Sequence, residues 1–155
     1  MNAIQLLKED HDNVKELFKK FEDANKRTKQ RILEQIINEL ETHTHLEEEI
    51  FYPAVMDGTE EEGQDMVYES IEEHRLVDFM IERIREVESD DESFESKVKV
   101  LQELVEHHIQ DEEKEMFPLV KKQMKDELDR LGDEMSELKN DIKAESGQGK
   151  KRAAM

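Results

Sequence analysis

Apolar residues recur at alternating steps of three and four along four long stretches of the chain. The first such line consists of Ile4, Leu7, His11, Val14, Phe18 and Phe21. The other lines run through residues 33–54, 67–84 and 98–119. Side chains at this spacing fall on one face of an α-helix, so each stretch predicts an amphipathic helix with one buried face.

Three polar clusters, residues 23–28, 57–63 and 89–93, separate the four stretches. They contain Asp, Asn, Gly and Ser, which are common in turns. Connections this short bring consecutive helices together as antiparallel neighbours. The predicted fold class is therefore all-α, with an up-down-up-down four-helix bundle over residues 1–130.

The apolar pattern continues more weakly beyond the bundle. Leu131, Met135, Leu138 and Ile142 are spaced as on a helix, which predicts a short extra C-terminal helix over residues 131–145. The last residues, 146–155, show no such pattern, and we expect them to form a flexible tail.

The composition excludes several classes of protein. The 155 residues include 42 acidic and 23 basic side chains, a formal net charge of −19, whereas binding to nucleic acid needs clustered Lys and Arg. The absence of cysteine excludes disulfides, thiolate metal sites and a cysteine nucleophile. The N-terminal residues lack the pattern of a signal peptide, and the longest apolar run is too short to span a membrane. We expect a soluble, cytoplasmic protein with no nucleic-acid or membrane partner.

The sequence also repeats itself. Residues 40–55 match residues 105–120 at an offset of 65, and the repeat aligns His43, Glu47, Glu48 and Pro53 with His108, Glu112, Glu113 and Pro118. His11 and His74 are related by a nearly equal offset of 63. The repeated unit is a pair of helices, which predicts a pseudo-twofold bundle whose halves present the same side chains to one place.

Six ionisable residues occupy positions that the helical pattern assigns to the interior: His11, His43, Glu47, His74, His108 and Glu112. A buried, ionised carboxylate is strongly destabilising unless it is paired or binds a metal. No Lys or Arg lies on the same lines to compensate the two glutamates. Each glutamate follows a histidine by four residues, so both side chains project from one face of their helix. We predict a metal site with these six side chains as ligands.

Two metal ions account for this ligand set better than one. Each ion would receive two imidazoles, both carboxylates would bridge, and an oxo or hydroxo bridge from solvent would complete five donors. One position on each ion would stay open. Ligation by nitrogen and oxygen is compatible with iron, manganese or zinc, and the spacing does not choose among them.

Other interpretations of these histidines exist. A single histidine on an apolar face is usually a hydrogen-bonded core residue, and a metal-free acidic bundle is the corresponding alternative for the whole chain. Two further pairs, His45 with Glu49 and His107 with Asp111, share the four-residue spacing. They lie off the interior lines and lack a counterpart in the other repeat. We expect them at the surface or in support of the ligands.

Two pairs of repeated residues lie close to the predicted ligands. Glu48 and Glu113 sit beside the interior lines, which favours a solvated or supporting role over ligation. Pro53 and Pro118 follow the acidic pairs by about one turn, and we expect them to end or kink their helices.

The doubled motif resembles the HHE cation-binding domain of the hemerythrin-like superfamily. The resemblance rests on His11, on His43-x-x-x-Glu47-Glu48 with the Phe-Tyr-Pro53 ending, on His74, and on His108-x-x-x-Glu112-Glu113 with Met-Phe-Pro118. It covers about residues 1–130. The resemblance implies a non-haem di-iron centre in a four-helix bundle, with the four histidines as terminal ligands and the two glutamates as bridges.

One residue of the chain, Asp78, differs from the pattern of the oxygen-carrying hemerythrins. Oxygen-carrying hemerythrins place a second histidine four residues after the third-helix ligand, and Asp78 occupies that position here. The chain resembles instead the branch with four histidines and two carboxylates, which is associated with oxygen, peroxide or nitric oxide chemistry and with iron sensing or handling. Tyr52 could reach an open iron position, although its repeat equivalent is Phe117.

Two functional hypotheses follow. The first is a pair of non-haem iron ions, oxo- or hydroxo-bridged, that bind or react with oxygen, peroxide or nitric oxide, as a sensor or as a peroxide-consuming enzyme. The second is an iron-binding or iron-sensing module without turnover, read out by a protein partner through residues 126–155. A serine–histidine–aspartate triad is not supported, because no serine lies on the interior lines near these histidines.

Overall fold

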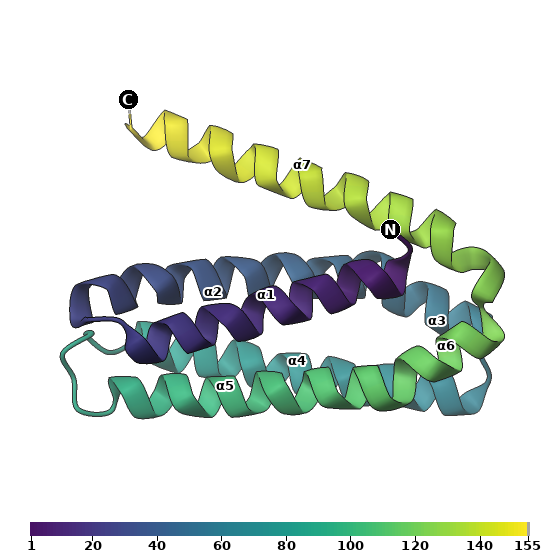
Figure 1. Cartoon of the computed structure of the whole chain (residues 1–155), viewed down its shortest axis with the longest axis horizontal. Coiled ribbons are helices and arrows are strands. Elements are labelled where there is room, and N and C mark those ends of the chain that lie inside the picture. Colours follow the sequence, from purple (N-terminus) through teal and green to yellow (C-terminus); the bar gives the residue numbers. More distant parts are fainter. Residues whose placement is uncertain (155) are drawn as a thin grey trace.

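The computed structural model describes the backbone of residues 1–154 and the side chains of residues 1–146. Every regular element within residues 1–154 is a helix, which confirms the all-α class (Figure 1). The long helices are α1 (Ala3–Asp23), α2 (Lys26–Leu46), α4 (Glu61–Arg85), α5 (Phe94–Asp111) and α7 (Leu128–Ala154). The short elements are two π-helical turns, η1 (Glu47–Phe51) and η2 (Glu112–Met116), the helices α3 (Tyr52–Gly58) and α6 (Phe117–Gln123), and the 3-10 turn η3 (Lys125–Glu127).

The helices α1, α2, α4 and α5 lie along one another, and consecutive ones run in opposite directions (Figure 1). Contacts join α1 to α2, α4 to α5 and α1 to α5. The connections fall in the three polar clusters expected from the sequence. At the first connection Asn25 caps α2, because its side chain accepts a hydrogen bond from the backbone N–H of Thr28 at 3.0 Å. Among the described residues, no helix has both the length and the apolar composition needed to cross a membrane.

The C-terminal helix is longer than the sequence analysis predicts. It begins at Leu128 rather than at residue 131 and continues to Ala154, so it includes residues 146–154 of the expected tail. Met155, the last residue of that expected tail, lies outside the described residues. The structure therefore has five long helices instead of four and a short one. The apolar pattern underestimates α7 because, among side chains 128–146, the buried apolar ones lie in the first half of the helix, and α7 contacts α1, α2 and η1.

Small and apolar residues let α7 lie against the N-terminus. Leu128, Leu131 and Met135 are buried in one cluster with the first turns of α1. Gly132 is also buried, and a Cβ atom there would lie 2.3 Å from the backbone oxygen of Met1. Glycine at this position is therefore a condition of the close contact between α7 and the start of the chain.

The apolar core has two parts, and the polar line residues lie between them. One part contains Val14, Phe18 and their neighbours towards the α1–α2 connection, and the other contains Ile4, Leu7 and the first half of α7. In α1, His11 separates Leu7 of one part from Val14 of the other. The six predicted ligands thus form a polar layer that crosses an otherwise apolar interior.

The π-helical turns correct the predicted burial pattern after each glutamate. The interior lines of the sequence analysis continue through Ile50 and Ala54, yet these residues are only half-buried, while Phe51 and Val55 are buried. A π-helical turn holds one extra residue, so the buried face moves by one position beyond it. The second repeat behaves in the same way, since Leu119 is half-buried and Val120 is buried.

Proline gives a local reason for these turns. Pro53 and Pro118 each lie in the first turn of the helix that follows a π-helical turn. Proline has no N–H group, so it cannot bond the carbonyl four residues before it, and the wider π-type bonding is favoured there. The chain stays helical through both prolines, which therefore do not end their helices; the expected kink stays a prediction.

Candidate metal centre

The structure brings all six predicted ligands together at one level of the bundle. His11 comes from α1, His43 from α2, His74 from α4 and His108 from α5, while each glutamate is the first residue of a π-helical turn. All six side chains are buried, with exposed fractions of 8 % or less. The six polar groups form two sets that share Glu47: His11, His43, Glu47 and Glu112, and Glu47, His74 and His108.

The inner nitrogens of the four imidazoles, Nε2, face the two carboxylates. Glu47 Oε1 lies 3.3 Å from His43 Nε2, 3.1 Å from His74 Nε2 and 3.7 Å from His108 Nε2. Glu112 Oε1 lies 3.2 Å from His11 Nε2, and its Oε2 atom lies 3.5 Å from His108 Nε2. Each glutamate thus lies beside histidines of both halves, which is the position a bridging ligand requires.

Several of these buried atoms lie close to one another but form no hydrogen bond of acceptable geometry. They are His11 Nε2, His43 Nε2, Glu47 Oε2 and Glu112 Oε1. Buried polar atoms in folded proteins are nearly always paired, so unpaired ones need an explanation. A cation between them satisfies all of them at once, and imidazole with carboxylate is a donor set that transition metals accept. The residues present therefore fit a metal centre.

The outer nitrogen of each imidazole, Nδ1, also bonds a carboxylate. His11 Nδ1 lies 2.7 Å from Glu113 and His74 Nδ1 lies 2.8 Å from Glu48. These are the repeated glutamates for which the sequence favours a supporting role. A carboxylate on Nδ1 fixes the orientation of the ring and leaves Nε2 to face the centre.

Two more carboxylates complete this outer layer and are missed by the sequence analysis. His43 Nδ1 lies 3.0 Å from Asp10, and His108 Nδ1 lies 2.8 Å from Glu73. Each of these acids directly precedes a predicted ligand in the sequence, and they share the 63-residue offset of His11 and His74. That repeated acid–histidine pair is the signal that could have identified them.

Tyr52 lies inside the centre. Its side chain is buried, and its hydroxyl donates a hydrogen bond to Glu112 Oε2 at 2.5 Å. The same hydroxyl lies 3.3 Å from His74 Nε2 and 3.4 Å from His108 Nε2. Burial, together with the charge of Glu112, raises the pKa of Tyr52 well above its usual value, so its phenol stays protonated. The equivalent Phe117 instead stacks on His11, with ring centroids 5.9 Å apart.

The other histidines lie outside the cluster. The side chain of His45 is 50 % exposed and lies 3.6 Å from Glu49. The side chain of His107 is 65 % exposed and lies 3.2 Å from Asp111. The position of both at the surface agrees with the expectation from the repeat.

A small cavity adjoins the four histidines. Its volume is about 30 Å³, and aliphatic side chains of the first core part, including Val14, Leu40, Val77 and Val105, complete its wall. A cavity of this size holds a molecule of about the size of water. The space next to the imidazoles therefore suits one diatomic or similarly small ligand.

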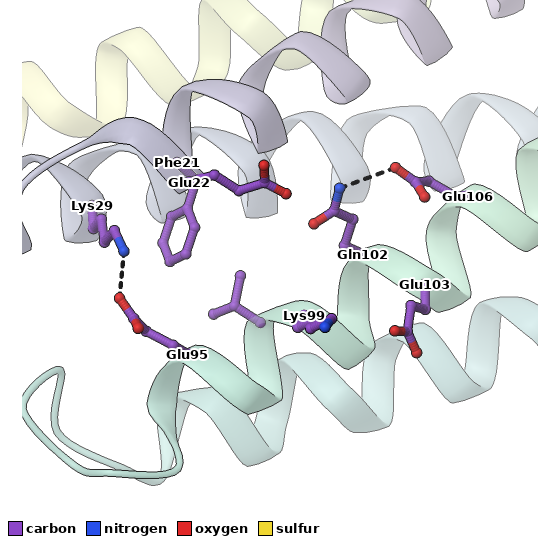
Figure 2. Close-up of a pocket in the computed structure, with 9 residues that line it drawn as sticks. Phe21, Glu22, Lys29, Glu95, Lys99, Gln102, Glu103 and Glu106 are labelled. Carbon is purple, nitrogen blue, oxygen red and sulfur yellow. Dashed lines mark hydrogen bonds and ion pairs between the residues drawn. The ribbon is translucent and has the colours of Figure 1, made fainter.

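A larger depression, about 480 Å³, lies where the end of α1 faces the start of α5 (Figure 2). Four of its seven polar side chains are paired with one another: Lys29 with Glu95, and Gln102 with Glu106 at 3.0 Å. Phe21 forms part of its wall. No set of unpaired groups among these lining residues converges there, and we assign this depression no role.

Without a metal, the buried carboxylates favour protonation of the four imidazoles. Burial by itself lowers the pKa of His43, but the negative charges of Glu47 and Asp10, together with the hydrogen bond that His43 Nδ1 donates to Asp10, raise it overall to about 10. The pKa values of the other three predicted histidine ligands are also raised, by neighbouring carboxylates and against burial. The pKa of Glu47 is well below its usual value, since His43 and its other neighbours oppose the effect of burial.

These shifts give the metal-free protein a defined pH dependence. The pKa of His43 rises from 6.5 to about 10 on folding, so the protonated imidazole stabilises the folded state. This stabilisation is present in full below pH 6.5 and is lost as the pH rises towards 10. We predict that the free energy of unfolding of the metal-free protein falls by about 1 kcal/mol per pH unit between pH 7 and 9. Urea unfolding at several pH values measures this. The slope should be smaller in His43→Ala and unchanged in His45→Ala, and a flat or rising profile would contradict the assignment.

Comparison with known proteins agrees with this geometry. Residues 2–120 match the family described as Hemerythrin HHE cation binding domain. The fold is similar to the crystal structure of a Hemerythrin HHE cation binding domain-containing protein from Mycobacterium kansasii, with a TM-score of 0.83. The superposition covers 94 % of this chain and 89 % of the M. kansasii chain, and the two sequences are 23 % identical. This similarity establishes the shared fold.

Two curated relatives are longer than this chain. An uncharacterized hemerythrin-like protein from Schizosaccharomyces pombe is 28 % identical over 119 residues, which are 76 % of this chain and 59 % of that protein. A protein named DNA nickase from Nostoc sp. is 29 % identical over 129 residues, which are 82 % of this chain and 36 % of that protein. The match over residues 2–120, together with the convergent histidines and glutamates, places the chain in the hemerythrin HHE cation-binding domain family.

Proposed function

We propose that the chain is a non-haem di-iron protein whose four-helix bundle, formed by α1, α2, α4 and α5, holds two iron ions. His11, His43, His74 and His108 would be the terminal ligands, and Glu47 and Glu112 the bridges. The observation that carries the proposal is the set of buried, unpaired atoms on His11, His43, Glu47 and Glu112. The position of each glutamate beside histidines of both halves supports the bridging role.

Iron is chosen over manganese and zinc because of the family resemblance. The nitrogen and oxygen donors accept all three metals. Iron would supply redox chemistry at positions left open by the protein, with an oxo or hydroxo group from solvent as the remaining bridge. Metal binding requires the imidazoles to lose their protons, so iron affinity should increase with pH.

Oxygen, peroxide and nitric oxide are the ligands that fit the site. The adjoining cavity of about 30 Å³ admits one small molecule, and its aliphatic wall favours uncharged ones. The hydroxyl of Tyr52 keeps its proton next to Glu112 and can donate a hydrogen bond to a ligand in the centre. The chain would act as a sensor of these molecules or as an enzyme that consumes peroxide.

An iron-binding or iron-sensing module without turnover is the alternative. Its support is the contact between α7 and the centre: Lys139 of α7 bonds Asp10, which in turn bonds His43. A change at the metal could thus reach a surface helix that a protein partner reads. The greater length of the two relatives agrees with a domain that serves a larger protein. A cytoplasmic location and the lack of a nucleic-acid partner stay predictions, the latter supported by the net charge of −19.

Iron content tests the ligand set. Anaerobic loading followed by elemental analysis should give two irons per chain. His43→Ala and His108→Ala each remove an inner nitrogen and should leave one iron or none, whereas His45→Ala and His107→Ala, matched changes at the surface, should keep two. One iron or none in the unmodified chain would contradict the dinuclear proposal. An empty site in His45→Ala alone would show that the helical register is misassigned.

Reaction with oxidants separates the two functions. We expect oxygen, peroxide or nitric oxide to change the absorption spectrum of the iron-loaded protein, because each iron keeps an open position. Repeated consumption of peroxide identifies an enzyme, and a spectral change without turnover identifies a sensor. Tyr52→Phe should keep two irons, since Phe117 occupies the equivalent position in the other half, and should slow any proton-dependent step. No spectral change and no loss of peroxide would contradict the open positions.

A further inference from the structure

The two halves of the centre have equivalent predicted histidine ligands and the same kind of carboxylate bonded to the Nδ1 atom of His43 or His108. Asp10 accepts from His43 within the α1–α2 pair, and Glu73 accepts from His108 within the α4–α5 pair. Both acids are one residue before a predicted ligand, and the sequence repeat relates them. Up to this point the pseudo-twofold relation predicts equal environments for His43 and His108.

The two halves differ in what contacts the second oxygen of Asp10 and of Glu73. Lys139 Nζ, from α7, lies 2.5 Å from Asp10 Oδ1. The lysine side chain is only 17 % exposed and the Asp10 side chain 3 %, so this ion pair is largely removed from solvent. The second oxygen of Glu73 instead faces His107 Nε2 at 3.5 Å, and that histidine is 65 % exposed.

The position of α7 explains the difference. This helix packs on α1, α2 and η1, where Ala3, Leu7 and Leu46 are buried. The repeat places Met66, Ser70 and Asp111 at the equivalent positions of the other half, and these residues line a shallow groove. A charged residue in place of Leu46 makes the second half unsuited to an apolar helix. Among residues 1–146, no lysine or arginine forms an ion pair with Glu73.

We propose that Lys139 is a positioning residue for the His43 half of the metal centre. The proposal rests on the metal centre proposed above. Lys139 and His43 hold the two oxygens of Asp10, so the carboxylate has one fixed orientation. A fixed Asp10 keeps the proton of His43 on Nδ1 and directs the lone pair of Nε2 into the centre.

The consequence is two unequal metal positions. The position beside His43 depends on α7, whereas the position beside His108 relies on a carboxylate whose second neighbour is the exposed His107. Loss of the lysine should therefore weaken one metal position and spare the other. A lysine that merely attached α7 to the bundle would affect thermal stability and leave the two positions alike.

Calorimetric titration of the metal-free full chain with Co²⁺ tests this. The unmodified protein should bind two ions. Lys139→Met should weaken one of the two binding steps about tenfold, the lower end of the range for loss of a group that supports a metal ligand, and should leave the other step unchanged. Lys139→Arg should restore most of the affinity. Lys143→Met, a change at an exposed lysine of the same helix, should bind as the unmodified chain does.

A double-mutant cycle separates positioning from attachment. In an Asp10→Asn background the effect of Lys139→Met on Co²⁺ affinity should disappear, because the lysine acts through that carboxylate. In the Zn²⁺-loaded protein, Lys139→Met should also move the NMR signal of the His43 Nδ1 proton and not that of His108. Equal weakening of both steps, no change in either step, or a tenfold effect that persists in Asp10→Asn would overturn the proposal. If the unmodified chain binds neither Co²⁺ nor iron, the proposed metal centre fails as well, whereas two-ion binding with no effect of Lys139→Met refutes the positioning role alone.

Discussion

Two carboxylates share the interior of this bundle with four imidazoles, and compensation of their charge is the constraint on which the centre depends. Glu47 and Glu112 are almost fully buried, and among residues 1–146 neither forms an ion pair with a lysine or arginine. Protonated histidines compensate this charge in the metal-free chain, because the neighbouring carboxylates raise the pKa of His43 to about 10, and Tyr52 adds a hydrogen bond to Glu112. A metal ion would take the place of those protons and supply the positive charge instead.

The same constraint accounts for the layered construction around the centre. Each imidazole turns Nε2 inward and gives Nδ1 to a carboxylate, so the rings are oriented before any metal arrives. The π-helical turns begin at the two glutamates and shift the chain by one residue, which buries Tyr52 on one side and Phe117 on the other. The apolar parts above and below exclude water from the polar layer and strengthen its electrostatic interactions.

Much of this arrangement follows from the sequence because helical spacing and the internal repeat constrain each other. The step of four from His43 to Glu47 sets one face, and the match with His108 and Glu112 sets the second, so the convergence of the ligands is predictable. The buried positions beyond Glu47 are not predictable, because a π-helical turn interrupts the helical period on which the prediction rests. Phe51 is buried there instead of Ile50.

Contacts between elements that are distant in the sequence could not be predicted either. The ion pair between Asp10 and Lys139 joins residues 129 positions apart, and nothing in the periodicity of either helix indicates it. The length of α7 is hidden for a related reason. The helical spacing of its apolar residues ends at Ile142, so the sequence beyond that residue shows no amphipathic signal, although the chain from Ser136 onward contains no proline to end the helix.

Anomalous diffraction from crystals of the iron-loaded protein would show whether the polar layer holds two iron ions, because it locates iron without reference to activity. We expect two iron peaks in the polar layer, one beside His11 and His43 and one beside His74 and His108, with Glu47 and Glu112 contacting both. A single peak in that layer, or iron bound only at the surface group of Glu73, His107 and Asp111, would contradict this expectation.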